Sequence, residues 1–95
     1  MKKRAAKSTK PVNWGELLRE KRVEKGLTQA ELSSKLNYPN PQFISLMERS
    51  LSKIPLTTMG RLIDILDLDA NFVIAHLIEE YSHTVRTEIK KGKRA

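Results

Sequence analysis

Several residues near the middle of the chain have side chains that can recognise the edges of nucleic-acid bases. They are Asn40, Gln42, Ser45, Leu46 and Arg49. Gln42 is the strongest candidate, because a glutamine amide can donate to and accept from one adenine. Leu46 offers an apolar group for a thymine methyl, and Arg49 a guanidinium for a guanine or a phosphate. The alternatives are that Leu46 covers the core, that Arg49 belongs to a solvated face, and that Asn40 is a helix cap.

A helix over residues 41–49 would bring these side chains together. The last four members of the set follow i, i+3, i+4, i+7 spacing, which places them on one helix face. A second face, directed at the core, would contain Ile44, Met47 and Leu51. Pro41 moves Asn40 out of the helical region, so Asn40 can cap this helix and Pro41 can open it.

Four further helices are predicted around it, over residues 13–25, 29–36, 55–67 and 69–89. Asn13 with Glu16, and Thr28 with Glu31, have the spacing of capping boxes, and Gly26 supplies a left-handed stop. The inward apolar positions of these helices include Trp14, Leu18, Leu32, Leu36, Leu56, Met59, Leu62, Ile63, Leu66 and Val73. No segment has the pattern of a strand. The pattern therefore predicts an all-α bundle of five helices, flanked by a basic disordered arm (1–12) and a basic tail (90–95).

Size and composition limit what this bundle can be. A chain of 95 residues with 39% hydrophobic positions forms one domain with one modest core. The absence of cysteine excludes disulfides and thiolate zinc sites and favours a reducing, cytoplasmic location. The longest apolar run, residues 72–75, is too short for a membrane span or a signal peptide.

The net charge of +7 is unevenly distributed along the chain. Residues 1–10 carry five basic side chains and residues 90–95 carry four, with no acidic residue in either segment. Residues 13–61 have eight basic and five acidic side chains, whereas residues 62–89 have one basic and six acidic. The first part of the domain can thus face phosphates and the second part cannot. The basic arm either contacts a nucleic acid or keeps the protein soluble.

The segment 17–68 resembles the helix-turn-helix domain of the Cro/repressor (xenobiotic-response-element) family. The resemblance lies in residues 27–32 (LTQAEL), residues 43–49 (FISLMER) and the spacing of Leu56, Met59, Leu62, Ile63 and Leu66. It implies a compact, lambda-repressor-like bundle whose third helix enters the DNA major groove. The sequence departs from the family pattern at two places. The turn before the third helix is one residue longer than usual, and Ser50 stands where the family commonly has glycine. The third helix is therefore expected to end without a left-handed glycine.

The start of the second helix is a candidate phosphate site, because its free amides and dipole favour an anion. The resemblance places the family's phosphate-contacting glutamine at Gln29, next to Thr28, which caps the helix in any case. Lys35, Lys53 and Arg61 are further candidate phosphate contacts; the alternative is that each is an ordinary surface residue.

Arg22 lies on the same face of its helix as Trp14 and Leu18, so it needs a partner. Glu48, next to the inward Met47, is the candidate, and the resemblance pairs the same two positions. A partly buried ion pair would tie the first helix to the third; the alternative is a solvent-facing Arg22.

The last predicted helix carries more apolar surface than a small bundle can cover. Its later apolar residues, Ile78, Tyr81, Val85 and Ile89, are the candidate interface of a homodimer. The alternative is that this helix folds back on its own domain.

No constellation of catalytic or metal-binding residues is found. His76 and His83 are seven positions apart on one helix, too far to share a zinc ion easily. The carboxylates at Asp64, Asp67, Asp69, Glu79 and Glu80 lack an accompanying nucleophile and fit helix caps and a solvated face. We expect no enzyme activity, no metal and no cofactor.

These observations favour a sequence-specific DNA-binding transcriptional regulator. The expected form is a dimeric repressor that binds a pseudo-palindromic operator in double-stranded DNA through the major groove. One alternative is an antitoxin or controller-type autoregulator that also binds a partner protein through its C-terminal helix. Another is a helical adaptor that binds protein instead of DNA.

Overall fold

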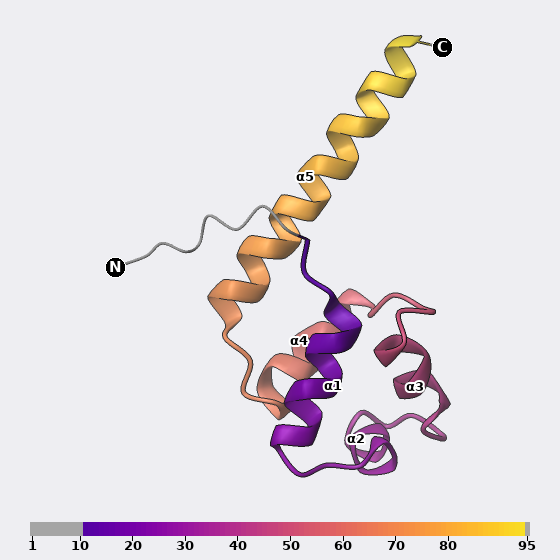
Figure 1. Cartoon of the computed structure of the whole chain (residues 1–95), viewed down its shortest axis with the longest axis vertical. Coiled ribbons are helices and arrows are strands. Elements are labelled where there is room, and N and C mark those ends of the chain that lie inside the picture. Colours follow the sequence, from indigo (N-terminus) through magenta and orange to yellow (C-terminus); the bar gives the residue numbers. More distant parts are fainter. Residues whose placement is uncertain (1–10, 95) are drawn as a thin grey trace.

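The computed structural model describes residues 11–94 and is built of helices alone over that range (Figure 1). In chain order these are α1 (Trp14–Glu24), α2 (Gln29–Lys35), α3 (Gln42–Glu48), α4 (Leu56–Ile65) and α5 (Ala70–Arg94). The predicted all-α architecture of five helices is confirmed. Most of the predicted basic arm, residues 1–10, and residue 95 of the predicted tail lie outside the described residues.

Helices α1 to α4 and the first turn of α5 enclose one core. Its buried apolar residues are Leu18, Leu32, Leu36, Ile44, Met47, Met59, Leu62, Leu66 and Val73. Two residues predicted to face inward do not, since Leu51 is 64% exposed and Leu56 is 75% exposed. Leu51 follows the end of α3, so the helical periodicity that directed it inward no longer applies. On α4 the buried face is completed by Thr58, whose Oγ1 lies 2.6 Å from the Tyr38 hydroxyl.

Each of the four bundle helices ends with a residue in the left-handed region. These residues are Gly26, Asn37, Ser50 and Asp67, with φ of 72°, 62°, 60° and 54°. After each one, the next amide donates to the carbonyl oxygen five residues back, which satisfies carbonyls at the helix end. Ser50 therefore takes the left-handed turn expected of a glycine, and α3 stops sharply without one.

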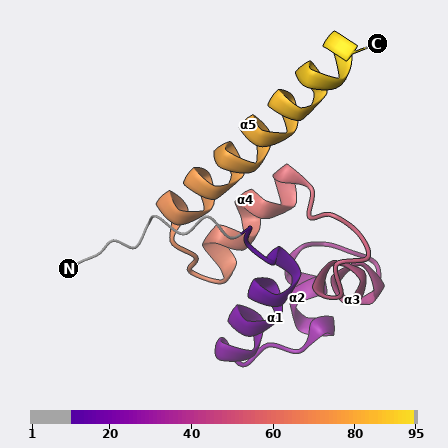
Figure 2. The same ribbon diagram turned by 45° about the horizontal axis from the view of Figure 1, so that its top comes forward.

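Helix α5 is longer than predicted. It continues through Gly92 to Arg94, whereas the periodicity predicted an end near residue 89 followed by a loose tail. The difference arises because one glycine lowers helix stability by only about 1 kcal/mol, which does not end a long helix. The start of α5 lies next to α4, and its later turns project away from the bundle (Figures 1 and 2).

Trp14 joins the middle of α5 to the start of α1. Its Nε1 donates to Glu80 Oε2 at 2.6 Å, and its ring packs edge-on against Phe72 with the ring centroids 6.5 Å apart. Over residues 11–94, no helix has both the length and the apolar character needed to cross a membrane.

Candidate nucleic-acid interface

The turn between α2 and α3 is fixed by a buried serine. Ser33 is 2% exposed, and its hydroxyl donates to the Asn40 carbonyl oxygen at 2.6 Å. The Asn40 side chain in turn accepts from the Gln42 amide at 2.9 Å. Asn40 thus satisfies a free amide at the start of α3, although the helix begins at Gln42, one residue later than predicted. These two hydrogen bonds set the position at which α3 starts.

Tyr38 supports the same turn from the side of α4. Its ring packs at a tilt against Phe43, with the centroids 5.3 Å apart, and its hydroxyl lies 2.6 Å from Thr58 Oγ1. Because Phe43 belongs to α3 and Thr58 to α4, the tyrosine fixes the first turn of α3 relative to the core.

The end of α3 is held by a buried ion pair. Arg22 Nε and Nη2 donate to the two carboxylate oxygens of Glu48 at 2.5 and 3.2 Å, and the Glu48 side chain is 2% exposed. A third donor, Arg22 Nη1, binds the Leu27 carbonyl oxygen at 2.7 Å. Gln29 completes the network by donating from Nε2 to Glu48 Oε1 at 2.9 Å. One carboxylate therefore links α3 to α1 and to the start of α2.

Gly15 allows α1 to approach α3 closely. A Cβ atom at this position would lie 2.5 Å from the Met47 carbonyl oxygen and 2.7 Å from that of Glu48. Because both obstructing atoms belong to the backbone, a side chain would force α1 and α3 apart. The sequence signal for such a contact is the position of Gly15 inside a helix, since a glycine there lowers helix stability and often has a packing role.

The opposite face of α3 is open to solvent. Gln42 and Arg49 are exposed, and Ser45 and Leu46 are half-buried. A shallow hollow on this side is lined by Gln29, Asn40, Pro41, Gln42, Ser45 and Arg49. The fold thus brings together four of the five residues predicted to contact bases with the glutamine predicted to contact phosphate. Leu46 does not line this hollow.

The other predicted phosphate contacts are more dispersed. Thr28 is used in a capping box, in which its hydroxyl accepts from the Glu31 amide at 3.0 Å and its amide donates to Glu31 Oε1 at 2.8 Å. Arg61 binds the carbonyl oxygens of Leu36 and Lys35 at 2.9 and 2.7 Å, so its guanidinium caps the C-terminal end of α2.

Lys35 and Lys53 are both exposed but lie apart from the α3 hollow. Lys35 lines a different depression, together with Arg61. Lys53 lies in the loop after α3, beside Ser50 and Leu51. The structure therefore does not gather the predicted phosphate contacts into one cluster.

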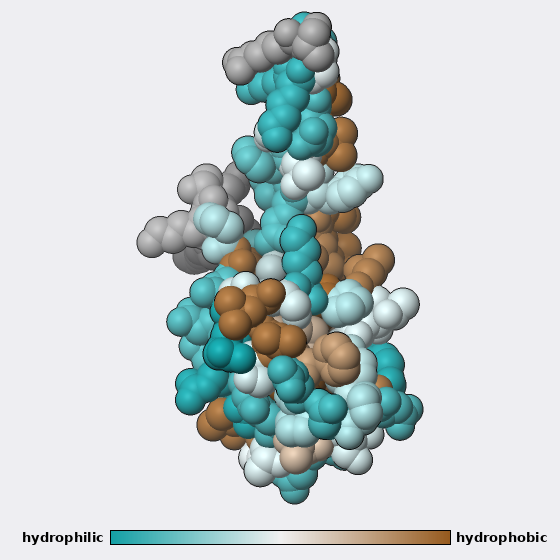
Figure 3. Space-filling view, turned by 90° about the vertical axis from the view of Figure 1, so that its right-hand side faces the viewer, coloured by the Kyte–Doolittle hydropathy of each residue, from teal (hydrophilic) through white to brown (hydrophobic). Residues whose placement is uncertain are grey.

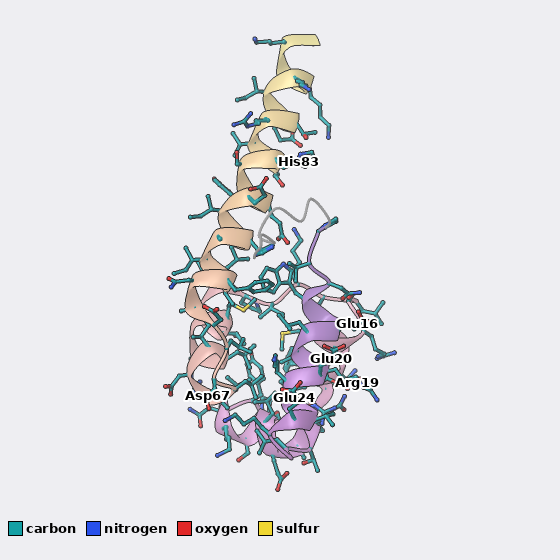
Figure 4. All side chains as sticks on the ribbon, turned by 60° about the vertical axis from the view of Figure 1, so that its left-hand side comes forward. Glu16, Arg19, Glu20, Glu24, Asp67 and His83 are labelled. Atoms are coloured by element: carbon teal, nitrogen blue, oxygen red, sulfur yellow. The ribbon has the colours of Figure 1, made fainter. Side chains whose placement is uncertain are left out.

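Acidic side chains lie on another side of the domain. Figure 4 shows Glu16, Glu20 and Glu24 along the outer side of α1, with Arg19 among them. Within residues 11–94, no group of three or more potential ligands could hold a metal ion. His83 lies on the projecting part of α5, and His76 Nδ1 lies 2.9 Å from the Phe72 carbonyl oxygen (Figure 4).

Comparison with known proteins places this arrangement in a family. Neither the proteins of curated function nor the solved structures include a match to the chain. Residues 18–73, more than half of the chain, match the family described as "Helix-turn-helix". The match extends from α1 into α5 and contains the whole α2–turn–α3 unit described above. The resemblance to Cro/repressor domains is confirmed: the chain belongs to this helix-turn-helix family and is a DNA-binding transcription regulator.

Proposed function

We propose that the protein is a dimeric, cytoplasmic repressor that recognises a specific pseudo-palindromic operator. Each copy inserts the open face of α3 into the major groove of one half-site. Occupation of the operator excludes RNA polymerase from the promoter. The protein performs no catalysis in this role and needs no cofactor.

One observation carries this proposal: the two faces of α3 have opposite properties. Its inner face is fixed by the ion pair of Arg22 with Glu48 and by the contact at Gly15. Its outer face presents Gln42 and Arg49 around an open hollow. A helix held rigidly from behind and polar in front can contact base edges without first becoming ordered, which favours specific binding.

The proposed contacts follow from the position of each side chain. Gln42, at the first turn of α3, pairs with an adenine, and Ser45 contacts the neighbouring base. Arg49, one turn after Ser45, binds a guanine or a phosphate. Gln29 lies at the rim of the same hollow. The second hydrogen of its Nε2, which is not used by Glu48, can be donated to a phosphate oxygen. Asn40 acts mainly as a cap, because its Oδ1 already accepts from the Gln42 amide.

Selection of binding sites from a random duplex pool tests the proposal directly. The expected result is an enriched inverted repeat, since two identical copies read two half-sites in opposite orientations. If no duplex is enriched at moderate salt, the proposal is wrong. A reporter gene downstream of the selected site then separates repression from activation.

Variants of the outer face of α3 show which residue reads which base. Gln42→Ala should lower affinity by about 1–3 kcal/mol and relax the preference at one base position. If Arg49 binds a phosphate, Arg49→Ala weakens binding to all sites and lowers the slope of log affinity against log salt by roughly 0.9. Arg19→Ala on the outer side of α1 is the matched control, because it removes the same charge from another side of the domain (Figure 4).

A second candidate function is a controller that also binds a partner protein. The apolar side chains of Leu51 and Leu56, 64% and 75% exposed, lie outside the apolar stripe of α5 and favour this alternative. If these leucines remain accessible to a soluble paramagnetic probe in the DNA-bound protein, they are available to a partner. Complete protection of both in the dimer would exclude this surface.

A further inference from the structure

The part of α5 that follows Val73 carries a continuous apolar stripe. It consists of Ile74, Ile78, Tyr81 and Val85, continued by Ile89, and these residues are 51%, 63%, 73%, 38% and 52% exposed. Figure 3 shows apolar residues gathered along one edge of this helix. The first four follow 4–3–4 spacing, which is the spacing of core positions in a coiled coil. The stripe lies about 100° around the helix from the side that holds Val73 against the bundle.

We propose that this stripe pairs with the same stripe of a second copy, and that the two α5 helices run antiparallel. The proposal rests on the homodimer of the proposed function and specifies its interface. In the best register Ile74 of one copy lies opposite Val85 of its partner, and Ile78 lies opposite Tyr81. All four core positions are then filled by apolar side chains in both directions. Ile89 of one copy lies at the same level along the axis as the small Ala70 of the other.

The distribution of charge along α5 favours the antiparallel direction. Residues 67–80, which run from just before α5 to its middle, carry four acidic side chains and no lysine or arginine, whereas residues 81–93 carry four basic side chains and one acidic. Antiparallel pairing places the basic end of each helix beside the acidic start of its partner. Lys90 then lies opposite the partner's Asp69, which is exposed. A parallel pair would bring the like-charged ends together.

The residues that continue the heptad also disfavour a parallel pair. In a parallel coiled coil the core positions after Val85 would be Glu88 and Gly92. Two Glu88 carboxylates would then face each other across the seam, which costs free energy through like-charge repulsion. In the antiparallel register Glu88 lies opposite the exposed Asn71 instead. The positions that flank the seam over residues 75–84 are Ala75, Leu77, Ser82 and Thr84, none of which is charged.

Antiparallel pairing also separates the two DNA-binding units. In this register Ala70 of one copy lies at the same level as Ile89 of the other, so the two helix starts are 19 residues apart along the axis. At about 1.5 Å per residue this corresponds to roughly 28 Å. That separation is similar to the spacing of about 34 Å between half-sites one helical turn apart. A parallel pair would hold the two bundles side by side at one end.

Disulfide cross-linking tests the direction of the pair, because the chain contains no cysteine. Ile74→Cys and Val85→Cys are each introduced into the full chain, and one of the two variants carries a small tag. Both sites are exposed, so the bundle should fold normally. Oxidation of the mixed proteins should give a disulfide-linked heterodimer. Val85→Cys alone should not cross-link, since its two thiols would lie about 16 Å apart along the axis, beyond disulfide reach.

A second pair of cysteines tests the same register without changing the apolar seam, and a control tests for non-specific cross-linking. Asn71→Cys mixed with Glu88→Cys should cross-link as well, since these two exposed residues lie directly opposite each other in this register, and the changes leave the four apolar core positions intact. His83→Cys, on the outer side of the coil, should form no disulfide-linked dimer on oxidation. Efficient self-cross-linking of Val85→Cys would overturn the proposal in favour of a parallel pair. Failure of both mixed pairs would overturn it too.

The outcome is independent of the test of function. Site selection with the unmodified chain reports whether the protein binds an inverted repeat, whatever the direction of α5. An enriched inverted repeat without the predicted cross-links would therefore refute the antiparallel pair and leave the proposed function standing. If the predicted cross-links form but no sequence is enriched, the antiparallel pair is supported and the proposed function is refuted.

Discussion

The bundle and the part of α5 beyond Glu80 are stabilised by different kinds of side-chain hydrogen bond. In the bundle, side chains far apart in the sequence bind one another: Arg22 and Gln29 both donate to Glu48, 26 and 19 positions away. Beyond Glu80, the side-chain hydrogen bonds of the described residues join positions three or four apart on α5 itself. Such local pairs stabilise a helix by only about 0.2–0.5 kcal/mol each.

This difference indicates where each region acts. The bundle uses its buried polar contacts to fix α3, so its stability and the position of the helix that we propose to bind DNA depend on the same residues. The part of α5 that follows Val73 has five large apolar side chains that remain 38–73% exposed in the described chain. Substitutions should therefore affect folding in the bundle and association in α5.

Removing the buried carboxylate of the bundle should have the largest effect. Glu48→Ala leaves Arg22 without a charged partner in a site where the arginine side chain is 11% exposed. A stranded buried charge costs about 3–5 kcal/mol, so the melting temperature should fall steeply. Thermal unfolding followed by circular dichroism measures this. Glu79→Ala, an exposed glutamate on α5, is the control and should change stability by less than about 0.5 kcal/mol.

The next largest effect should come from a single methyl group. Gly15→Ala places a Cβ against two backbone carbonyl oxygens of α3, and overpacking of this kind costs about 1–3 kcal/mol. Gly60→Ala makes the same change in α4, where nothing lies within 4 Å, and should stabilise by up to about 1 kcal/mol. Opposite signs of the two effects in urea unfolding would support the packing role of Gly15. Equal stabilisation by both substitutions would show that α1 and α3 are not in close contact.

The left-handed helix ends provide a smaller effect within the bundle. Ser50 and Gly26 occupy equivalent positions after α3 and α1, with φ of 60° and 72°. Ser50→Gly should stabilise by about 0.5 kcal/mol, because glycine adopts this conformation without steric cost but loses more entropy on folding. Gly26→Ser should destabilise by a similar amount. If Ser50→Gly is destabilising, the Ser50 hydroxyl, 3.4 Å from Asn13 Oδ1, contributes more than the turn costs.

The features that sequence could predict are those that depend on neighbouring residues. The order of the helices and the caps at Asn13 and Thr28 follow from spacing over a few positions, and the structure has them. The exposure of Leu51 and Leu56 was not predicted, because periodicity shows which face a residue occupies but not where the helix leaves the core. A glycine inside a helix indicates that Gly15 packs closely against something, but no local pattern identifies its partners, the Met47 and Glu48 carbonyl oxygens, or the Asn40 carbonyl oxygen that Ser33 binds.

The same limit applies to the candidate interface. The spacing of Gln42, Ser45 and Arg49 was sufficient to place them on one face of α3. Gln29 lines the same hollow and donates to Glu48, 19 positions away, and local spacing predicts neither contact. The role of Arg61 at the end of α2 could not be predicted either, because a surface arginine has the same local sequence whether it binds phosphate or a carbonyl.

The smallest effect on folding is expected in α5. Ile78→Ser removes an apolar side chain that is 63% exposed, so at low protein concentration it should change the free energy of unfolding by less than about 0.5 kcal/mol. Leu62→Ser, at a site that is 1% exposed, should be strongly destabilising at every concentration. The unmodified chain should melt at a higher temperature as its concentration rises, because association stabilises the folded state, and Ile78→Ser should weaken that dependence. If Ile78→Ser instead lowers the melting temperature equally at all concentrations, Ile78 packs within its own copy. The contrast between a bundle that folds and a helix that associates would then be wrong.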